Sequence, residues 1–340
     1  MKRLKIIEKL VFFINSIVAT MLLLSYILPH VSPGKFAFLS VLSLAVPVLI
    51  LLNILFVIYW LLKVKKQLLL SLLVLSIGYT YLFSLYKFSS SKDVEDEANL
   101  SVMTYNVRLF NLFEWIKDKD VKKEMLSFIK TQEPDIISLQ EYRPDESIQL
   151  KNYHKFEKVS GNKVKSGQAI FSKYPIVNSG SIEFPNSSNN AIYVDIVKLK
   201  DTIRIYNVHL QSLRIDPNVE KLAEESSENL FKRVGGTFKM QQSQTELFLR
   251  NKAKCPYKMI ICGDFNNTAY SYVYKEIKGE LQDTFVEAGN GFGRTFNFKF
   301  FPVRIDFILA DKDFEVNSFK TFDTELSDHY PIMTKLKLHH

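Results

Sequence analysis

Several short apolar runs in this 340-residue chain end in acid, amide or imidazole side chains. Asp328 and His329 stand side by side near the C-terminus, Asp264 and Asn266 close a second run, and Glu141 closes a third. Carboxylates are ligands for hard cations, and a carboxylate and an amide aimed at one point can hold and deprotonate a water molecule. These residue types are what a metal-dependent hydrolase of phosphate esters requires.

Four further residues are candidates only as part of a set. Taken singly, Asn106 has the properties of a turn residue and His209 those of a hydrogen-bonded histidine within a strand. Arg304 and Asp306 are spaced two apart, as are Asp264 and Asn266, and an extended backbone points such pairs to one side. An ion pair on an exposed edge strand is the alternative interpretation of Arg304 and Asp306.

In this order, the residues resemble the motifs of the endonuclease/exonuclease/phosphatase superfamily, the deoxyribonuclease-I-like metal-dependent phosphodiesterases. The resemblance covers about residues 100–338 and none of the preceding chain. The matching segments are Thr104–Arg108, Pro134–Glu141, Gly167–Pro175, Asn207–Gln211, Gly263–Asn266, Arg304–Phe307 and Ser327–Pro331.

The resemblance implies a four-layer α/β sandwich, in which two packed β-sheets are flanked by helices and the active site lies at one end. It implies that Glu141 binds Mg²⁺, with Mn²⁺ as the alternative ion, and that Asn106 lies near the metal or the phosphate. It further implies a water-activating Asp264 assisted by Asn266, and a phosphate-contacting His329 held by Asp306. The remaining expected roles are His209 as a second imidazole on the phosphate, Asp328 as support for the metal site, and Arg304 as a substrate-binding residue.

Elementary chemistry agrees with these roles. A phosphodiester is anionic and repels hydroxide, and Mg²⁺ prefers oxygen ligands and neutralises the phosphate. Donors from Asn and His can stabilise the charge that develops on phosphorus. Zinc is disfavoured, because none of the six histidines falls in a compact ligand motif.

Strands and helices must position these residues. Periodicity predicts strands over 100–107, 135–139, 168–172, 176–184, 191–199, 203–210, 258–262, 303–310, 315–322 and 332–338. It predicts helices over 117–131, 238–251 and 271–277. The segments 152–167 and 212–236 show no clear period and are expected to be surface loops that select the substrate.

The first 88 residues are of a different kind. The apolar runs 10–28, 36–62 and 67–86 contain no acidic or basic residue, and about 20 residues suffice to cross a bilayer as a helix. We therefore predict a membrane domain of three transmembrane helices over 1–88, a polar linker over 89–99 and a catalytic domain over 100–340.

Charge predicts how these helices are oriented. Residues 1–88 hold nine of the 44 basic residues and one of the 36 acidic residues, which leaves 35 of each for the rest of the chain. Basic residues precede the first run and separate the second from the third, whereas Asp93, Glu95, Asp96 and Glu97 follow the third. Because positively charged loops stay in the cytoplasm, the N-terminus is predicted to be cytoplasmic and the catalytic domain to lie outside.

The sequence thus predicts a membrane-anchored, Mg²⁺-dependent phosphodiesterase or phosphatase of the endonuclease/exonuclease type. Its predicted partners are the bilayer and a phosphate-ester substrate, either a nucleic acid or a phospholipid. The net-neutral domain argues against tight binding to long nucleic acid. Two alternatives stay open. One is action on phospholipid, sphingomyelin or phosphoinositide, with the loop aromatics Phe292, Phe296, Phe298, Phe300 and Phe301 touching the bilayer. The other is an inactive membrane scaffold. The oligomeric state is not predicted.

Overall fold

The computed structural model describes residues 4–89, 91–92, 96, 98–117, 119–161, 164–213, 226–298 and 301–339. The predictions that involve Asp93, Glu95, Glu97, Phe300 and residues 214–225 of the loop 212–236 lie outside these residues.

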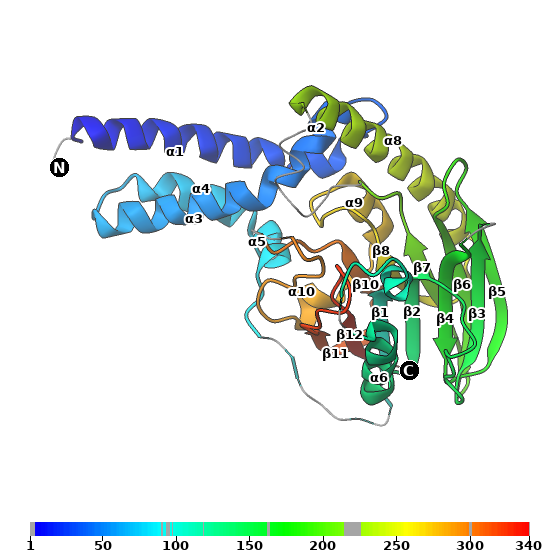
Figure 1. Ribbon diagram of the computed structural model, residues 1–340. Coiled ribbons are helices and arrows are strands. Elements are labelled where there is room, and N and C mark those ends of the chain that lie inside the picture. Colours follow the sequence, from blue (N-terminus) through cyan, green and yellow to red (C-terminus); the bar gives the residue numbers. More distant parts are fainter. Residues whose placement is uncertain are drawn as a thin grey trace.

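The N-terminal segment is helical and projects from one side of the β-rich domain (Figure 1). Its elements are α1 (Ile6–Ser25), η1 (Leu28–His30), α2 (Ala37–Val41), η2 (Leu42–Ala45), α3 (Val46–Leu62), α4 (Leu68–Ile77) and α5 (Tyr79–Leu85). Within the described residues, two helical stretches are long and apolar enough to cross a membrane, Ile6–His30 and Ala37–Leu62.

The predicted third span is the part of this segment that the structure corrects. The run breaks at Gly78 into α4 and α5, which meet at an angle of 81°. The ring of Tyr26 lies against Gly78, where a Cβ atom would be 2.0 Å from Tyr26 Cζ, so the chain turns at a residue without a side chain. The pair is either one broken span or a re-entrant turn.

Residues from Leu100 onward form two six-stranded sheets (Figure 1). The first sheet has the order β11-β12-β1-β2-β4-β3, and the second has the order β5-β6-β7-β8-β10-β9. The strands are β1 (Leu100–Asn106), β2 (Ile136–Tyr142), β3 (His154–Ser160), β4 (Ser166–Ser172), β5 (Ile176–Glu183), β6 (Asn190–Lys198), β7 (Asp201–His209), β8 (Lys258–Asp264), β9 (Gln282–Asp283), β10 (Asp306–Ala310), β11 (Phe314–Thr321) and β12 (Ile332–Leu338).

Helices cover the outer face of each sheet, which gives the layers expected of an α/β sandwich. Helix α6 (Val121–Gln132) packs on the first sheet, and α8 (Ser227–Lys252) and α9 (Tyr272–Lys278) pack on the second. The shorter η3 (Arg108–Asn111) and α10 (Thr284–Ala288) complete the domain. The sheets face one another across a buried aliphatic core that includes Val102, Ile136, Ile205, Ile260 and Ile308.

The inward faces of the strands change from apolar to polar toward one end. In β1 the inward side chains run from Val102 through Thr104 to Asn106, and in β8 they run from Ile260 through Cys262 to Asp264. Because side chains alternate across a strand, this period of two delivers one polar group per strand to the same end of the sandwich. β10 runs antiparallel to β8, so its first residue, Asp306, pairs with Asp264 at that end.

Several boundaries differ from those predicted, and three of these differences concern the surroundings of the polar end. β3 occupies part of the expected loop 152–167; its polar, exposed residues mark an edge strand and hide the alternation. Helix α8 begins at Ser227, eleven residues before its predicted start. β10 begins at Asp306, so Arg304 precedes the strand in which it was predicted to lie.

Candidate active site

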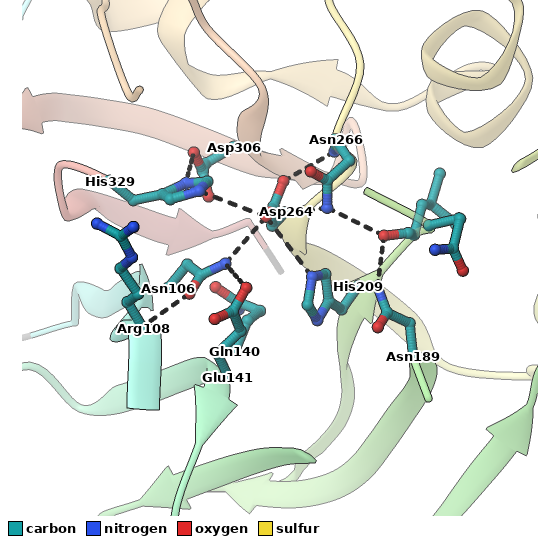
Figure 2. Close-up of polar contacts among 12 residues, drawn as sticks. Asn106, Arg108, Gln140, Glu141, Asn189, His209, Asp264, Asn266, Asp306 and His329 are labelled. Carbon is teal, nitrogen blue, oxygen red and sulfur yellow. Dashed lines mark hydrogen bonds and ion pairs between the residues drawn. The ribbon is translucent and has the colours of Figure 1, made fainter. Parts of the chain in front are cut away.

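Several of the predicted site residues lie together around the carboxylate of Asp264 (Figure 2). Asp264 ends β8 and is buried. It follows Gly263, whose φ is +136° and where a Cβ atom would lie 2.0 Å from Val208 O, so this close passage of two strands requires glycine. The carboxylate is therefore held at a fixed position by a strand that has no room to shift.

Two asparagines hold the Asp264 carboxylate. Asn106 Nδ2 donates to Asp264 Oδ2 at 3.0 Å. Asn266 donates twice, from its backbone N to Oδ1 at 2.8 Å and from Nδ2 to Oδ2 at 3.1 Å. The backbone from Asp264 to Asn266 was expected to be extended, and this expectation is wrong. Asn266 has a left-handed φ of 49° and contacts Asp264 through a tight turn. Asn266 therefore fixes the carboxylate through direct hydrogen bonds to both of its oxygens.

Two imidazoles complete the surroundings of Asp264. His209 Nε2 and His329 Nε2 each lie 3.7 Å from Asp264 Oδ2. His329 Nδ1 is 2.9 Å from Asp306 Oδ2, and the Phe296 ring packs edge-on against the imidazole. His329 is therefore oriented from behind, with its second nitrogen turned to the centre of the site (Figure 2).

Glu141 stands at the edge of this group. Asn106 Nδ2 lies 3.4 Å from Glu141 Oε1, so the same amide faces both carboxylates. The pairing of β2 with β4 is irregular between Leu139 and Tyr142, and Glu141 has a left-handed φ of 48°. Such bulges redirect side chains next to active sites, and this one lies beside Glu141, whose carboxylate faces Asn106.

Asp328 and Arg304 are placed differently. Asp328 faces Arg108, with 3.3 Å between its Oδ2 and Arg108 Nε, and so lies beside the group rather than in it. Arg304 is separate from the group. Its Nη1 pairs with Asp283 Oδ2 at 2.7 Å, and the rings of Phe285 and Phe307 pack on its guanidinium. This position does not support the expected substrate-binding role of Arg304.

Sequence reasoning missed the amides behind the site. Gln140 Nε2 donates to Asn207 Oδ1 at 2.6 Å and to Thr104 Oγ1 at 2.9 Å. The bond to Asn207 joins β2 of the first sheet to β7 of the second sheet next to the site. The signal was present in the alternation, since Gln140 continues the inward series of Ile136 and Ser138.

Burial and charge set the protonation of these groups. Burial raises the pKa of Asp264. The neighbouring His329 acts to lower this pKa, and the neighbouring Asp306 acts to raise it further. Burial alone would lower the pKa of His329, but the carboxylates of Asp306 and Asp264 raise it above the usual range. Burial, aided by the positive His329, lowers the pKa of His209 to about 3, so this imidazole is neutral. Burial also raises the pKa of Glu141.

These directions predict a bell-shaped pH dependence. If Asp264 acts as a base, its raised pKa means that kcat/KM falls as the pH drops through a value above the ordinary aspartate pKa of about 4. If His329 acts as a cation, kcat/KM falls again as the pH rises through its raised pKa. Profiles of the full-length protein on a soluble phosphodiester measure both limbs, and His329→Gln should abolish the alkaline limb. An acid limb near pH 4 would contradict the environment described for Asp264.

The chain was compared with known protein families and solved structures. A family model described as "Endonuclease/Exonuclease/phosphatase family" matches residues 103–329, and a model for a domain of unknown function matches residues 8–85. No protein of curated function matches the chain.

Solved structures share the fold of the C-terminal part. The endonuclease/exonuclease/phosphatase from Bacteroides vulgatus is 20% identical, with a TM-score of 0.55 over 71% of this chain and 99% of that one. The human Nocturnin catalytic domain with bound sulfate anion is 18% identical, with a TM-score of 0.52 over 71% and 94%. D. rerio TDP2 complexed with single strand DNA product is 15% identical, with a TM-score of 0.51 over 71% and 99%.

Proposed function

We infer that this chain, which belongs to the endonuclease/exonuclease/phosphatase family, is a membrane-anchored, divalent-metal-dependent phosphodiesterase. Members of the family are hydrolases of phosphate esters. The observation that carries the inference for this chain is the buried Asp264 carboxylate, held by two asparagines and facing two imidazoles. A buried carboxylate beside hydrogen-bond donors is suited to activating water next to an anionic ester.

Each side chain then has a defined task. Asp264 accepts the proton of the attacking water, and Asn266 and Asn106 keep the carboxylate aimed. His329, held by Asp306, donates toward the phosphoryl oxygens, where negative charge grows during attack. His209 Nε2 has no hydrogen-bond partner among the described residues, and as a neutral imidazole it can contact the phosphate or the leaving group.

Glu141 is the residue best suited to hold a divalent cation. No described Lys, Arg or His side chain forms an ion pair with it, although burial disfavours its charge, so a cation would supply the missing compensation. Asn106 turns its amide nitrogen toward Glu141, and its Oδ1 accepts from Arg108 N at 3.1 Å, so Asn106 orients the Glu141 carboxylate and offers no ligand oxygen of its own. Asp328 would support the site from the side. Bound Mg²⁺ or Mn²⁺ would neutralise and polarise the phosphate.

A second group of possible ligands, Asp264, Asp306 and His329, offers atoms within 4.8 Å of one another. We favour Glu141 because a ligating histidine must be neutral, whereas His329 is paired with Asp306 and its pKa is raised.

Metal dependence can be tested with a matched pair of glutamates. Glu141→Gln is expected to raise the Mg²⁺ concentration required for half-maximal hydrolysis of bis(4-nitrophenyl) phosphate about tenfold or more, because loss of even a supporting group costs about 10–100-fold. Glu133→Gln is the control, since Glu133 has the same φ of 48° but lies on the surface at the end of α6. Equal Mg²⁺ requirements in the two variants, or hydrolysis that persists in EDTA, would remove Glu141 and the metal from the proposal.

We also propose that the catalytic domain lies on the opposite side of the membrane from the N-terminus. Lys65, in the turn between α3 and α4, is 3.7 Å from Glu8 near the start of α1, so both lie at the same end of the bundle. That end points away from the catalytic domain (Figure 1). Its basic residues are expected to be cytoplasmic.

The orientation makes a clear prediction. Alkaline phosphatase fused after Leu338 is expected to be active in cells, and green fluorescent protein at the same place is expected to be dark, because the first folds only outside the cytoplasm. Fusions within the turn at Lys65 should behave in the opposite way. A fluorescent C-terminal fusion would mean that α4 and α5 form a re-entrant turn and that both termini are cytoplasmic.

Two substrate classes remain compatible with this chemistry. The likeness of the fold to D. rerio TDP2 complexed with single strand DNA product supports a nucleic acid. The contacts between the site and the membrane segment favour the second class, a phospholipid.

A further inference from the structure

The loop that carries Asn266 touches the membrane segment. This loop joins β8 to α9, and its Tyr270 lies in the buried cluster formed by the transmembrane helices. Tyr270 OH donates to Tyr81 O of α5 at 3.2 Å, and the two rings stack with centroids 5.9 Å apart. Only three residues separate Tyr270 from Asn266, so one short loop connects the site to the membrane helices.

Helix α8 makes a second connection through adjacent residues. Gln241 Nε2 donates to Asn266 O at 3.2 Å, and Gln241 Oε1 accepts from Asn267. The next residue, Gln242, accepts at Oε1 from Ser32 Oγ at 2.9 Å and from Gly34 N at 2.7 Å. The helix therefore holds the Asn266 loop and the connection between α1 and α2 at the same point.

Helix α2 packs directly onto α8 and onto the chain that leaves the site. Val41 of α2 lies in one buried cluster with Phe238 of α8 and with Leu213, four residues beyond His209. Gly235 permits the close approach, since a Cβ atom there would be 3.3 Å from Ala37 Cβ. Figure 1 shows α8 starting beside α2 and running across the catalytic domain.

A third connection lies beside Asp306. Arg304 Nη2 is 3.4 Å from Ser84 O near the end of α5, and Phe301 packs against the transmembrane cluster. The segments that carry His209, Asn266 and Asp306 thus all contact the membrane segment. The end of the sandwich that holds the candidate site is consequently the end that faces the bilayer.

Exposed aromatic side chains lie where α2 meets α8. Phe38 and Phe231 stack with centroids 5.4 Å apart and are 64% and 36% exposed, and Phe36 is 58% exposed. We name these three residues the aromatic rim. The exposed Lys35 lies in the turn just before α2, and the exposed Lys239 lies on α8. Aromatic rings with neighbouring lysines are typical of protein surfaces at the headgroup level of a membrane, where the cations favour anionic lipids.

We propose that the substrate is an anionic phospholipid of the surrounding bilayer, whose headgroup enters the site while its acyl chains stay against the aromatic rim. This proposal rests on the proposed hydrolase function. In the reaction, a water oxygen forms a new bond to phosphorus and one ester P–O bond breaks. One water proton goes to Asp264, and the other stays on the new oxygen bound to phosphorus. The leaving alkoxide takes a proton from solvent water to become an alcohol, and Asp264 then returns its proton to the solvent.

Charge supports lipid over nucleic acid. Residues 89–340 carry 35 basic and 35 acidic residues, whereas affinity for a polyanion grows with the number of cations that meet its phosphates. A single headgroup phosphate needs no extended basic track. The transmembrane helices also hold the site permanently beside a high local concentration of lipid.

The test uses the full-length protein in nanodiscs of phosphatidylglycerol and phosphatidylethanolamine with Mg²⁺. Three substrates are compared: the nanodisc lipids, followed by mass spectrometry, a single-stranded oligodeoxynucleotide, and the soluble bis(4-nitrophenyl) phosphate. The proposal expects conversion of phosphatidylglycerol at a rate that exceeds cleavage of the oligonucleotide. Hydrolysis of the soluble ester with no lipid product would overturn the lipid proposal and leave the hydrolase function standing. Failure on all three substrates would overturn the hydrolase function itself.

Variants of the aromatic rim make the test specific. Phe231→Ser and Phe38→Ser are expected to reduce lipid turnover about tenfold while changing hydrolysis of the soluble ester less than about twofold, because only the lipid buries apolar surface against these rings. Val177→Ser is the control, since Val177 is 60% exposed on the edge strand β5. An equal loss on both substrates in both rim variants, or equal lipid turnover in the rim and control variants, would count against the rim as a lipid contact.

Discussion

His329→Ala in the full-length protein is expected to lower kcat/KM for bis(4-nitrophenyl) phosphate by about 10²–10⁴-fold, and Asp264→Ala by a similar factor. His329 is the only imidazole in the group held by a carboxylate, with Nδ1 2.9 Å from Asp306, and its Nε2 faces Asp264. Its removal takes away the cationic donor at the place where the phosphoryl oxygens would gain charge.

The two variants should differ in stability. Asp264→Ala removes the acceptor of the Asn266 backbone N–H, and a buried group left unpaired costs about 1–3 kcal/mol. The side-chain amides of Asn106 and Asn266 each lose one acceptor and keep Glu141 Oε1 and Leu210 O, respectively. His329→Ala mainly leaves Asp306 without its partner. Thermal denaturation of each variant separates loss of fold from loss of chemistry.

His154→Ala is the control, because this histidine lies exposed on the edge strand β3 and should retain full activity. Retention of wild-type turnover by both site variants would show that the group around Asp264 is not catalytic.

Arg304→Met is expected to lower the free energy of unfolding by about 3–5 kcal/mol, because it leaves a buried carboxylate without its cation. Asp283 loses the bond from Arg304 Nη1 and keeps two neutral donors, the hydroxyl of Tyr274 to the same oxygen at 2.6 Å and the backbone N of Phe285 to Oδ1 at 3.0 Å. The variant also loses the contact of the guanidinium with Ser84 O of α5, which should loosen the catalytic domain from the membrane segment.

A surface pair provides the comparison. Arg294→Met breaks an ion pair with Asp323, whose side chain is 80% exposed, and should cost less than about 1 kcal/mol. Guanidinium denaturation of the detergent-solubilised protein, followed by limited proteolysis, measures both variants. A higher KM for Arg304→Met with an unchanged unfolding midpoint would restore the substrate-binding role predicted from sequence.

Agreement between sequence and structure is best where the signal is local. Alternation in β1, β7 and β8 is enough to place Asn106, His209 and Asp264 on inward faces, because the two-residue period follows from strand geometry alone. The order of the motifs indicated the family, and the family model over residues 103–329 confirms it. The apolar runs of the N-terminal segment are likewise a property of composition.

Agreement fails where a residue's partner is distant in the chain. Arg304 and Asp306 have the same spacing as Asp264 and Asn266, yet Arg304 turns away to Asp283 while Asp306 faces His329. The spacing of the residues does not predict the left-handed φ of Asn266. It also does not predict that the third apolar run bends at Gly78, where the ring of Tyr26 packs.

The amino-acid sequence alone therefore specified the family, the apolar stretches of the first segment that are long enough to cross a membrane, and most of the polar residues at the end of the sandwich, because alternation and hydropathy act over a few neighbouring residues. Only the folded chain decided which buried charges pair and that α2, α5 and α8 bring the site against the membrane segment. Those contacts join residues as much as 220 positions apart, as between Ser84 and Arg304, and the packing of whole helices on sheets selects them.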